Sequence, residues 1–339
     1  MVPSALLQSM RAGLDRFSGL DATVEWSLAA LSPWERSTLV QCSIFRGGFT
    51  RAAAAAIVDL GAFPEAPGVG TLIDQLCDKS LLYATPLADG GERLGIFGAV
   101  REHASRLLEQ TGQLDEAVRR HAQYYLAQGV RWAAGARGHS GADFRGLISA
   151  EQDNLLAIHQ RALETVPASS AHASRALVAA LVLDPVLAVR GPPGLQLSLL
   201  DTALELGGVT GAHPVLVARA HHARANLWRD FGELARALEE INRAIDLASK
   251  LGDEHLEAIG VAYRGTFRID QGQYEQARAD LEASLRVFEA RGDRRFQAFA
   301  MGNLGVLAVE EGRLDDALAF LLHSTCGGDC SMEQAVRGR

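Results

Sequence analysis

The sequence predicts a mainly α-helical protein, in which a small domain of helices and one β-hairpin precedes a superhelix of stacked helix pairs. A composition rich in Ala and Leu, with only 6% aromatic residues, favours helix. Gly232, Gly272 and Gly312 recur at intervals of forty residues, each followed at fixed spacing by Leu or Tyr and then by Ala. A fixed period of this size indicates stacked helix pairs, because one pair alone cannot bury its apolar face.

Length and charge limit the classes of function. The chain has 339 residues, 48% hydrophobic and 22% charged, which suits a globular protein of two or more domains. Its net charge of -8 gives no electrostatic footprint for a phosphate backbone, so nucleic-acid binding is disfavoured. No signal peptide is evident, and the longest apolar run, Ala176 to Val189, is interrupted by Asp184 and Pro185. With four cysteines in no framework, we expect a cytoplasmic protein without a membrane segment.

Two helices are predicted at the start of the segment 20–112. Ser32-Pro33-Trp34-Glu35 combines an N-cap, a proline at the first helical position and a capping-box glutamate. This predicts a helix that continues to about Ser43. After a Gly-Gly break, Thr50 can cap a second helix, Arg51 to Asp59.

A third helix and a hairpin complete this domain. The helix Thr71–Asp78 has one apolar face, formed by Leu72, Ile73 and Leu76. Ser80–Ala84 and Arg93–Phe97 read as two strands around a Gly-rich turn. Three helices followed by a hairpin is the layout of a winged helix.

The forty-residue units carry small residues where two helices would touch. Ala225, Gly265 and Gly305 fall at one such position, and each repeat has an alanine at another: Ala237, Ala277 and Ala317. In this respect the units resemble tetratricopeptide repeats, although they are longer and lack the usual terminal proline, so we expect extended helices. Leu200, Ala203, Leu204 and Leu206 suggest a degenerate first repeat.

Five motifs in a fixed order give a second resemblance. They are Asp21–Arg36, Phe45-Arg-Gly-Gly-Phe-Thr50, Leu76–Leu82, Val100-Arg-Glu-His103 and Glu151-Gln-Asp-Asn-Leu155. Together they resemble the winged-helix region and repeat entry of bacterial STAND-class (NB-ARC-like) signal-transduction ATPases. The family's ATPase lies upstream of these motifs, so the chain resembles a C-terminal portion of such a protein. The resemblance implies a regulator in which the winged helix relays a signal to an ATPase or kinase module encoded upstream.

These patterns give a prediction for the domain organisation. Residues 1–19 are expected to be a remnant helix of the upstream module, and 20–112 the winged-helix-like domain. Residues 113–210 are expected to form a helical linker with degenerate repeats, 211–325 the regular repeats and 326–339 a tail. The third repeat gives way to Cys326-Gly-Gly-Asp without a polar capping helix, so the array is predicted to be cut short.

No motif for catalysis, cofactor or metal is evident. The only Lys-Ser pair, Lys79-Ser80, lacks both glycines of a phosphate-binding loop and has Asp78 beside it. Cys326 and Cys330 are spaced four apart but have too few neighbouring ligands for a metal site. We therefore predict no enzyme activity, no cofactor and no metal; turnover of ATP by the chain would contradict this.

Two binding hypotheses remain. If the first helix of each pair lines the concave face, six side chains project into a groove that would bind a protein, a peptide or a small effector: Arg219, His222, Asn226, Arg229, Thr266 and Asp270. The alternative is a DNA-binding transcriptional regulator that reads bases with the helix Thr71–Asp78. Such a helix needs Arg or Lys, whereas this one offers Asp74, Gln75 and Asp78. We therefore favour a winged helix that packs and regulates.

Overall fold

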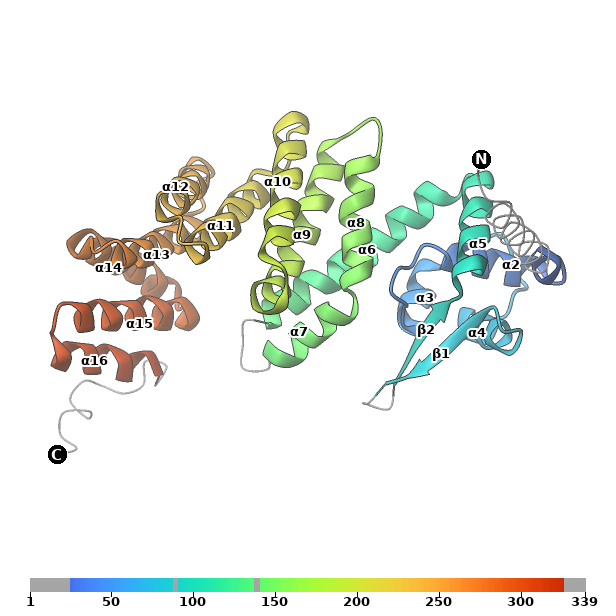
Figure 1. Cartoon of the computed structure of the whole chain (residues 1–339), viewed down its shortest axis with the longest axis horizontal. Coiled ribbons are helices and arrows are strands. Elements are labelled where there is room, and N and C mark those ends of the chain that lie inside the picture. Colours follow the sequence, from blue (N-terminus) through green and yellow to red (C-terminus); the bar gives the residue numbers. More distant parts are fainter. Residues whose placement is uncertain (1–24, 88–90, 137–140, 326–339) are drawn as a thin grey trace, which may run out of the picture. The chain divides into compact units, whose positions relative to one another are not determined.

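The computed structural model describes residues 25–87, 91–136 and 141–325, and these form two compact units divided between Arg161 and Ala162 (Figure 1). The N-terminal unit begins with a short helical stretch at 25–29. It continues through α2 (Pro33–Cys42), α3 (Arg51–Ile57), α4 (Val69–Asp78), β1 (Leu82–Pro86), β2 (Glu92–Ile96), α5 (Gly98–Gln110), α6 (Leu114–Gly135), α7 (Gly141–Ala150) and α8 (Gln152–Glu164). The expected remnant helix at 1–19 and tail at 326–339 lie outside the described residues.

The predicted caps of α2 and α3 are confirmed. Ser32 Oγ accepts the backbone N–H of Glu35 at 3.4 Å, and Glu35 Oε2 accepts the N–H of Ser32 at 2.9 Å, which completes a capping box. Thr50 Oγ1 accepts the N–H of Ala53 at 3.1 Å. The helix α3 ends two residues before the predicted Asp59, because the backbone of Asp59 is hydrogen-bonded to the side chain of Gln41 instead. Gln41 Oε1 accepts the N–H of Asp59, and Gln41 Nε2 donates to its carbonyl oxygen, both at 2.8 Å.

The hairpin follows α4 in the predicted order, with strand ends shifted by up to two residues. Strands β1 and β2 are antiparallel, with Leu82 opposite Ile96. Phe49 adds one bridge to Leu94, with N–O distances of 2.9 and 2.8 Å, and so ties the loop before α3 to the hairpin. Three helices and a hairpin are therefore present in the predicted order, while their assignment as a winged helix stays a prediction.

The turn between α5 and α6 carries a repeat-like sequence that lies outside the predicted forty-residue repeats. Gly112 lies in the left-handed region at φ +69°. Leu114 and Ala117 follow at the same spacing as Leu234 and Ala237 do after the first repeat glycine. The Gly-x-Leu-x-x-Ala pattern thus marks a turn between two helices here too, at the edge of the segment predicted to be a helical linker with degenerate repeats.

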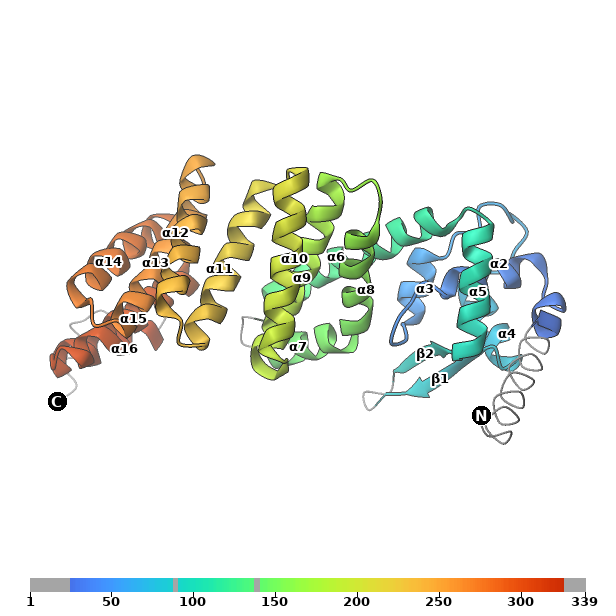
Figure 2. The same ribbon diagram turned by 45° about the horizontal axis from the view of Figure 1, so that its top comes forward.

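The C-terminal unit consists, within residues 162–325, of four successive helix hairpins (Figures 1 and 2). They are α9 (Ser170–Arg190) with α10 (Pro193–Thr210), α11 (Pro214–Asp230) with α12 (Leu234–Lys250), α13 (Glu254–Asp270) with α14 (Tyr274–Arg291), and α15 (Arg294–Glu310) with α16 (Leu314–Thr325). In the last three hairpins, the first helices begin forty residues apart and so do the second helices. The predicted mainly α-helical class and solenoid are confirmed.

The glycines of the repeat are confirmed as turn residues. Gly232, Gly272 and Gly312 have φ of +79°, +73° and +75°, and Gly252 and Gly292 have +67° and +66°. Glycine adopts this left-handed conformation without the cost that a Cβ would add. The aspartate after each of the second pair of glycines caps the next helix, with its Oδ1 accepting a backbone N–H at 3.0 or 3.1 Å. One Gly-Asp pair thus ends a helix and begins the next.

Small residues hold the two helices of a hairpin close together, as predicted. A Cβ on Gly265 would lie 2.9 Å from Leu281 Cγ and 3.2 Å from the carbonyl oxygen of Ala277. Ala225 is fully buried at the equivalent place. The suggested degenerate repeat corresponds to α10, in which Leu200 and Ala203 are among the buried residues.

The helix α9 is the one described helix that is long and apolar enough to cross a membrane by length and composition alone. Half of its apolar window is buried inside the protein, and Leu177 and Leu183 are fully covered. A core helix passes the same test. Pro185 lies inside this helix, so the predicted interruption of the apolar run does not end it.

Candidate functional site

The first helices of the repeats share a row of rings. The His222 ring of α11 lies edge-on to Tyr263 of α13, with centroids 4.2 Å apart. Tyr263 in turn stacks on Phe299 of α15, with centroids 4.7 Å apart. All three rings are half-buried. They form one continuous feature across three repeats, which we call the ring row.

First helices therefore contact each other directly, as α9 does with α11 and α13 with α15. No pair of second helices makes contacts of that extent within the described residues 162–325. In a stack of hairpins, the helices that approach each other more closely lie on the inside of the curve. This arrangement supports the prediction that the first helices line the concave side.

Arg229 and Asp270 of the predicted groove set are bound to each other. Arg229 Nε donates to Asp270 Oδ2 at 2.5 Å, and its guanidinium lies 5.9 Å from the ring centre of Phe267. The pair joins α11 to α13 and is about one-third exposed on each side. Such an exposed pair contributes only ~0.2–1 kcal/mol to stability. It leaves the other guanidinium N–H groups free to meet a ligand.

The other predicted groove residues differ in accessibility. Arg219 is exposed and lies one helical turn before His222, while Asn226 is half-buried one turn after it. Thr266 is 8% exposed, and its hydroxyl donates to the carbonyl oxygen of Ala262 at 3.2 Å, so it offers little to a ligand. Tyr263 is not among the predicted groove residues. The three rings lie at different positions of the forty-residue repeat, so the period does not align them.

Buried acids join first helices to second helices. Glu240 of α12 accepts hydrogen bonds from His221 at 2.7 Å and from Arg224 at 2.8 Å. One repeat later, Asp280 of α14 accepts from Arg264 at 2.7 Å. Burial would raise the pKa of Glu240, but the hydrogen bonds from His221 and Arg224 lower it below its ordinary value. These carboxylates are fully engaged within the fold and are structural groups.

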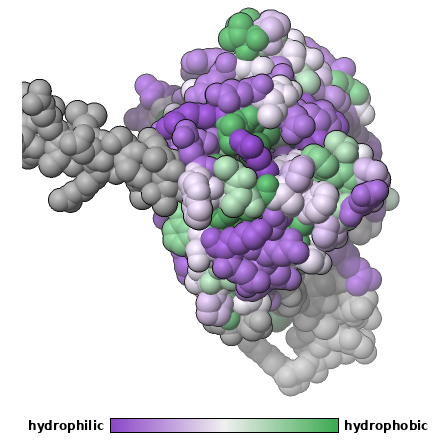
Figure 3. All heavy atoms as spheres, turned by 90° about the vertical axis from the view of Figure 1, so that its right-hand side faces the viewer, coloured by the Kyte–Doolittle hydropathy of each residue, from purple (hydrophilic) through white to green (hydrophobic). Residues whose placement is uncertain are grey.

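The candidate DNA-reading helix α4 has its nearby cations occupied. Arg51 pairs with Asp74 at 2.7 Å and also with Glu92 of the hairpin. Lys79, which follows α4, pairs with the buried carboxylate of Glu35. Seen from the N-terminal end, hydrophilic and hydrophobic residues intermingle on the described surface, without one dominant patch (Figure 3). The cations near α4 are therefore already paired with carboxylates, which adds to the charge argument against this helix reading DNA bases.

Two of the motifs that carry the STAND resemblance meet in the N-terminal unit. Asn154 of α8 accepts the N–H of Arg46 at 2.8 Å through Oδ1. Its Nδ2 donates to the carbonyl oxygen of Gly48 at 2.9 Å and to Glu151 Oε2 at 2.7 Å. Asn154 is fully buried. One amide group thus pins the Phe45–Thr50 loop to the start of α8.

The hairpin is tied to the same place. Arg93 of β2 donates both terminal nitrogens to the carboxylate of Glu151, at 2.9 and 3.1 Å, in a two-pronged pair. Its Nε donates to the carbonyl oxygen of Gly47 at 3.0 Å. A Cβ on Gly47 would lie 2.7 Å from Cβ of Asp153, so only glycine lets α8 approach this closely. We call Arg93, Glu151, Asn154 and their partners the α8 junction.

His121 completes the α8 junction from α6. Its Nε2 lies 3.1 Å from Asn154 Oδ1. That oxygen already accepts from Arg46, so Nε2 must carry the proton and donate. Burial and the nearby charges of Arg161 and Arg46 lower the pKa of His121 to about 3. Its Nδ1 is buried without a hydrogen-bond partner, so the ring stays neutral.

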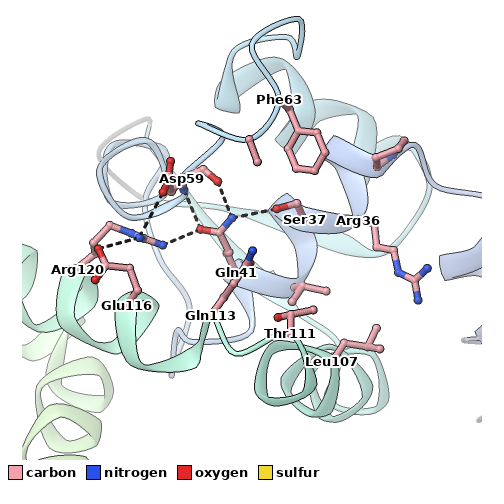
Figure 4. Close-up of a pocket in the computed structure, with 13 residues that line it drawn as sticks. Arg36, Ser37, Gln41, Asp59, Phe63, Leu107, Thr111, Gln113, Glu116 and Arg120 are labelled. Carbon is pink, nitrogen blue, oxygen red and sulfur yellow. Dashed lines mark hydrogen bonds and ion pairs between the residues drawn. The ribbon is translucent and has the colours of Figure 1, made fainter.

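A pocket of about 330 Å³ opens between α2, α5, α6 and the loop after α3 (Figure 4). Gln41 at its floor donates to Ser37 Oγ at 3.1 Å and to the carbonyl oxygen of Asp59 at 2.8 Å. Arg120 donates to Gln41 Oε1 at 3.0 Å and to the carbonyl oxygen of Ile57 at 2.7 Å. These polar groups are saturated by the fold, so the pocket presents no convergent set of catalytic groups.

Metal and thiol chemistry find no support in the parts of the chain that the structure describes. No group of three or more His, Cys, Asp and Glu side chains that could hold a metal ion occurs there. Burial raises the pKa of the Cys42 thiol to about 12, so it remains a packed thiol. Cys326 and Cys330 lie outside the described residues.

Comparison with known proteins supports the repeat assignment. Residues 257–325, which begin in α13 and reach the end of α16, match the tetratricopeptide repeat family. This segment is thus similar to a tetratricopeptide-repeat array. Such repeats are interaction scaffolds that present an extended concave surface.

Two curated relatives match a larger part of the chain. They are the proteins named Putative HTH-type transcriptional regulator Rv0890c of Mycobacterium tuberculosis and Putative HTH-type transcriptional regulator Mb0914c of Mycobacterium bovis. Each is 30% identical over 229 residues, which are 65% of this chain and 24% of the relative. The chain thus spans about a quarter of the length of the curated relatives it matches.

Two solved structures illustrate the repeat class. BtubC from P. vanneervenii has a TM-score of 0.45 and 16% identity, covering 64% of this chain and 93% of its own. A STAND protein with a tetratricopeptide repeat sensor from Pyrococcus horikoshii has a TM-score of 0.35 and 13% identity, covering 93% of this chain and 63% of its own. With TM-scores below 0.5, neither likeness adds to the family match.

Proposed function

We propose that the chain is a non-enzymatic interaction and regulatory module of a bacterial signalling protein, which binds a protein or peptide in the repeat groove. The ring row across α11, α13 and α15 carries this proposal. Aromatic rings and arginines are the side chains that contribute most to protein interfaces. The exposed Arg219 and the partly exposed Arg229 lie on the helix that begins the row. The partner's side chains would then pack on the rings while a carboxylate meets Arg219.

The regulatory part of the proposal depends on the STAND resemblance. In it, the occupied state of the groove is relayed through the winged-helix-like domain to an ATPase or kinase module encoded upstream. The α8 junction supports a role for α8 in such a relay, because it binds the Phe45–Thr50 loop and the hairpin at once. A change in the position of α8 would therefore act on both. We place the protein in the cytoplasm.

Site-specific photo-crosslinking tests the groove. A benzophenone amino acid replaces Arg219 in one variant and Val209, an exposed residue of α10, in the control. In cells of the source organism, we expect one discrete adduct from position 219 and none of that mass from position 209. Purified partner should then bind the Arg219→Ala/Asn226→Ala variant at least about tenfold more weakly, as loss of an interface anchor implies. Equal adducts at both positions would refute the groove proposal.

A second candidate function is DNA binding by the winged-helix-like domain, favoured by the names of the curated relatives. The pairing of Arg51 and Lys79 with carboxylates counts against it. A salt series of duplex mobility shifts decides between the two. Phosphate contacts would give binding that weakens steeply from 50 to 200 mM salt, whereas a protein-binding module gives no shift at any salt concentration.

A further inference from the structure

The last hairpin that the structure describes exposes five aliphatic side chains. On α15 these are Val306 and Val309, 45% and 47% exposed; on α16 they are Leu314, Leu318 and Leu322, 68%, 56% and 38% exposed. The three leucines recur every four residues and so lie on one face of α16. We call these five side chains the end surface. Contiguous apolar surface of this kind on a folded protein marks a site of interaction.

The repeat shows what the α15 positions do elsewhere in the array. Forty residues before Val306 and Val309 lie Thr266 and Ile269 of α13, which are only 8% and 9% exposed. Ile269 is buried in one cluster with Leu307 of the following first helix, α15. In the preceding repeat these positions are thus covered by the next first helix.

The α16 positions give the same result. Leu314 corresponds to Tyr274, which packs against the cluster that α15 completes. Leu318 corresponds to Leu238, which packs against the cluster that contains Phe267 of α13. Both equivalents therefore pack against clusters that include residues of a following first helix. The end surface continues an interface that the array already forms twice.

The chemistry of the end surface is more apolar than that of the interfaces it continues. The preceding hairpin has Thr266 and Arg278 at two of the equivalent interface positions, where Arg278 pairs with Glu311, and an exposed Glu282 at a third position. At the end surface all five positions are aliphatic. A face of a repeat that is exposed to water normally carries polar residues. The composition indicates a surface that is covered when the protein works.

The helices that cover equivalent surfaces share one pattern. Leu256, Gly260 and Phe267 of α13 face the hairpin before it, and Gly260 lies so close that an added Cβ would be 2.7 Å from Ile245 Cγ1. In α15 the same face carries Phe296, Ala300 and Leu307. The shared pattern is a bulky apolar residue, a small residue four positions later and a second bulky apolar residue eleven positions after the first. These spacings lie on one face of a helix.

We propose that the end surface binds an amphipathic helix of a partner protein that carries this bulky–small–bulky pattern. The helix takes the place that a further first helix would take, with its small residue over α16 and its second bulky residue near Val309 and Leu314. This is helix-in-groove recognition. It uses side chains outside the groove set of Arg219 and Asn226, so the two sites can be tested separately.

A labelled peptide with the sequence of residues 253–271 serves as the probe, because α13 carries the pattern. Fluorescence anisotropy measures its binding to the full chain. We expect saturable binding that the Leu314→Glu/Leu318→Glu variant weakens by about tenfold or more, since apolar anchors dominate such grooves. The matched control Leu147→Glu/Val209→Glu changes two exposed aliphatic residues elsewhere and should bind like the original chain.

Further measurements keep the test decisive. A Leu314→Gln/Leu318→Gln variant removes the apolar surface without adding charge and should also weaken binding, and circular dichroism shows whether both variants stay helical. A peptide with Leu256→Glu and Phe267→Glu should not bind. Absence of saturable binding, or equal binding by the double variants, would overturn the proposal. A dimer of the full chain that Leu314→Glu/Leu318→Glu converts to monomer would overturn it too, by showing a second copy on this surface.

Discussion

Replacing Asn154 with leucine removes the group at the centre of the α8 junction. Leucine has a branched side chain of similar shape, although it is larger, and it has no hydrogen-bonding atoms. The N–H of Arg46 then loses its partner at 2.8 Å. The carbonyl oxygen of Gly48 loses its contact at 2.9 Å but keeps the Arg93 guanidinium at 3.2 Å. His121 Nε2 and Glu151 Oε2 each lose one contact as well. We expect the Phe45–Thr50 loop to separate from α8.

The magnitude follows from the backbone N–H of Arg46 and the Nε2–H of His121, which both lose their hydrogen bond to Asn154. A buried polar group left without a partner costs ~1–3 kcal/mol. Two such groups give a loss of about 2–6 kcal/mol in the free energy of unfolding, which is a large share of the ~5–15 kcal/mol that a domain usually has. Asn154→Asp should be at least as damaging, because it brings a second carboxylate to 2.7 Å from Glu151.

Hydrogen exchange followed by mass spectrometry measures the two units separately, which a single unfolding curve would not do. Amides of α3 and α6 should lose protection in Asn154→Leu, while those of α12 to α14 keep theirs and serve as the internal reference. Gln110→Leu, a change at an exposed amide of α5, is the control and should alter protection little. A loss below about 1 kcal/mol for Asn154→Leu would refute the reasoning, since it is less than one unsatisfied group costs.

Three further predictions follow from the same structure. Gly265→Ala should destabilise the C-terminal unit by ~1–3 kcal/mol, because the added Cβ forces Leu281 aside. Gly302→Ala has open space around its Cβ and should stabilise the unit by ~0.5–1 kcal/mol. Chemical denaturation compares the two variants, and equal effects would contradict the packing argument. Gly272→Ala should cost ~1–2 kcal/mol from its φ of +73° alone, by the same measurement. The pKa of His121 is lowered to about 3 by burial and by Arg161 and Arg46. Below about pH 6.5 the unfolded chain therefore binds a proton that the folded one does not, and stability of the N-terminal unit should fall from pH 6.5 toward 3. His121→Gln should flatten this slope, and an unchanged slope would count against the assignment.

Local chemistry is the part of the fold that the sequence could predict. The capping box at Ser32, the cap at Thr50 and the left-handed glycines each depend on residues within one turn, so their signals are complete in a few letters. Small residues such as Gly265 could be placed because the period aligned them. The end of α3 could not be predicted, since it is set by Gln41 at a distance of eighteen residues.

Contacts between distant residues explain what the sequence could not show at the candidate sites. Asn154 binds backbone atoms more than one hundred residues earlier, and the motif around it was noticed only through a family resemblance. The ring row joins His222, Tyr263 and Phe299 at unequal spacings, so a search for a forty-residue period overlooks the last two. Periodicity predicts the scaffold, whereas the ring row consists of residues that do not follow the period.

The buried ion pairs also differ between repeats, whereas the helix hairpin itself is retained. Arg224 with Glu240 and Arg264 with Asp280 repeat at the forty-residue interval, but the third repeat has Leu304 and Phe320 at the same two positions. Leu304 and Phe320 meet in one apolar cluster. The helix α15 nevertheless has the same length as α11 and α13. Replacing a buried ion pair with packed apolar residues is often neutral or stabilising. The fold is therefore specified by the glycine turns and small contact residues, which all three repeats retain, and the charges are free to vary from one repeat to the next.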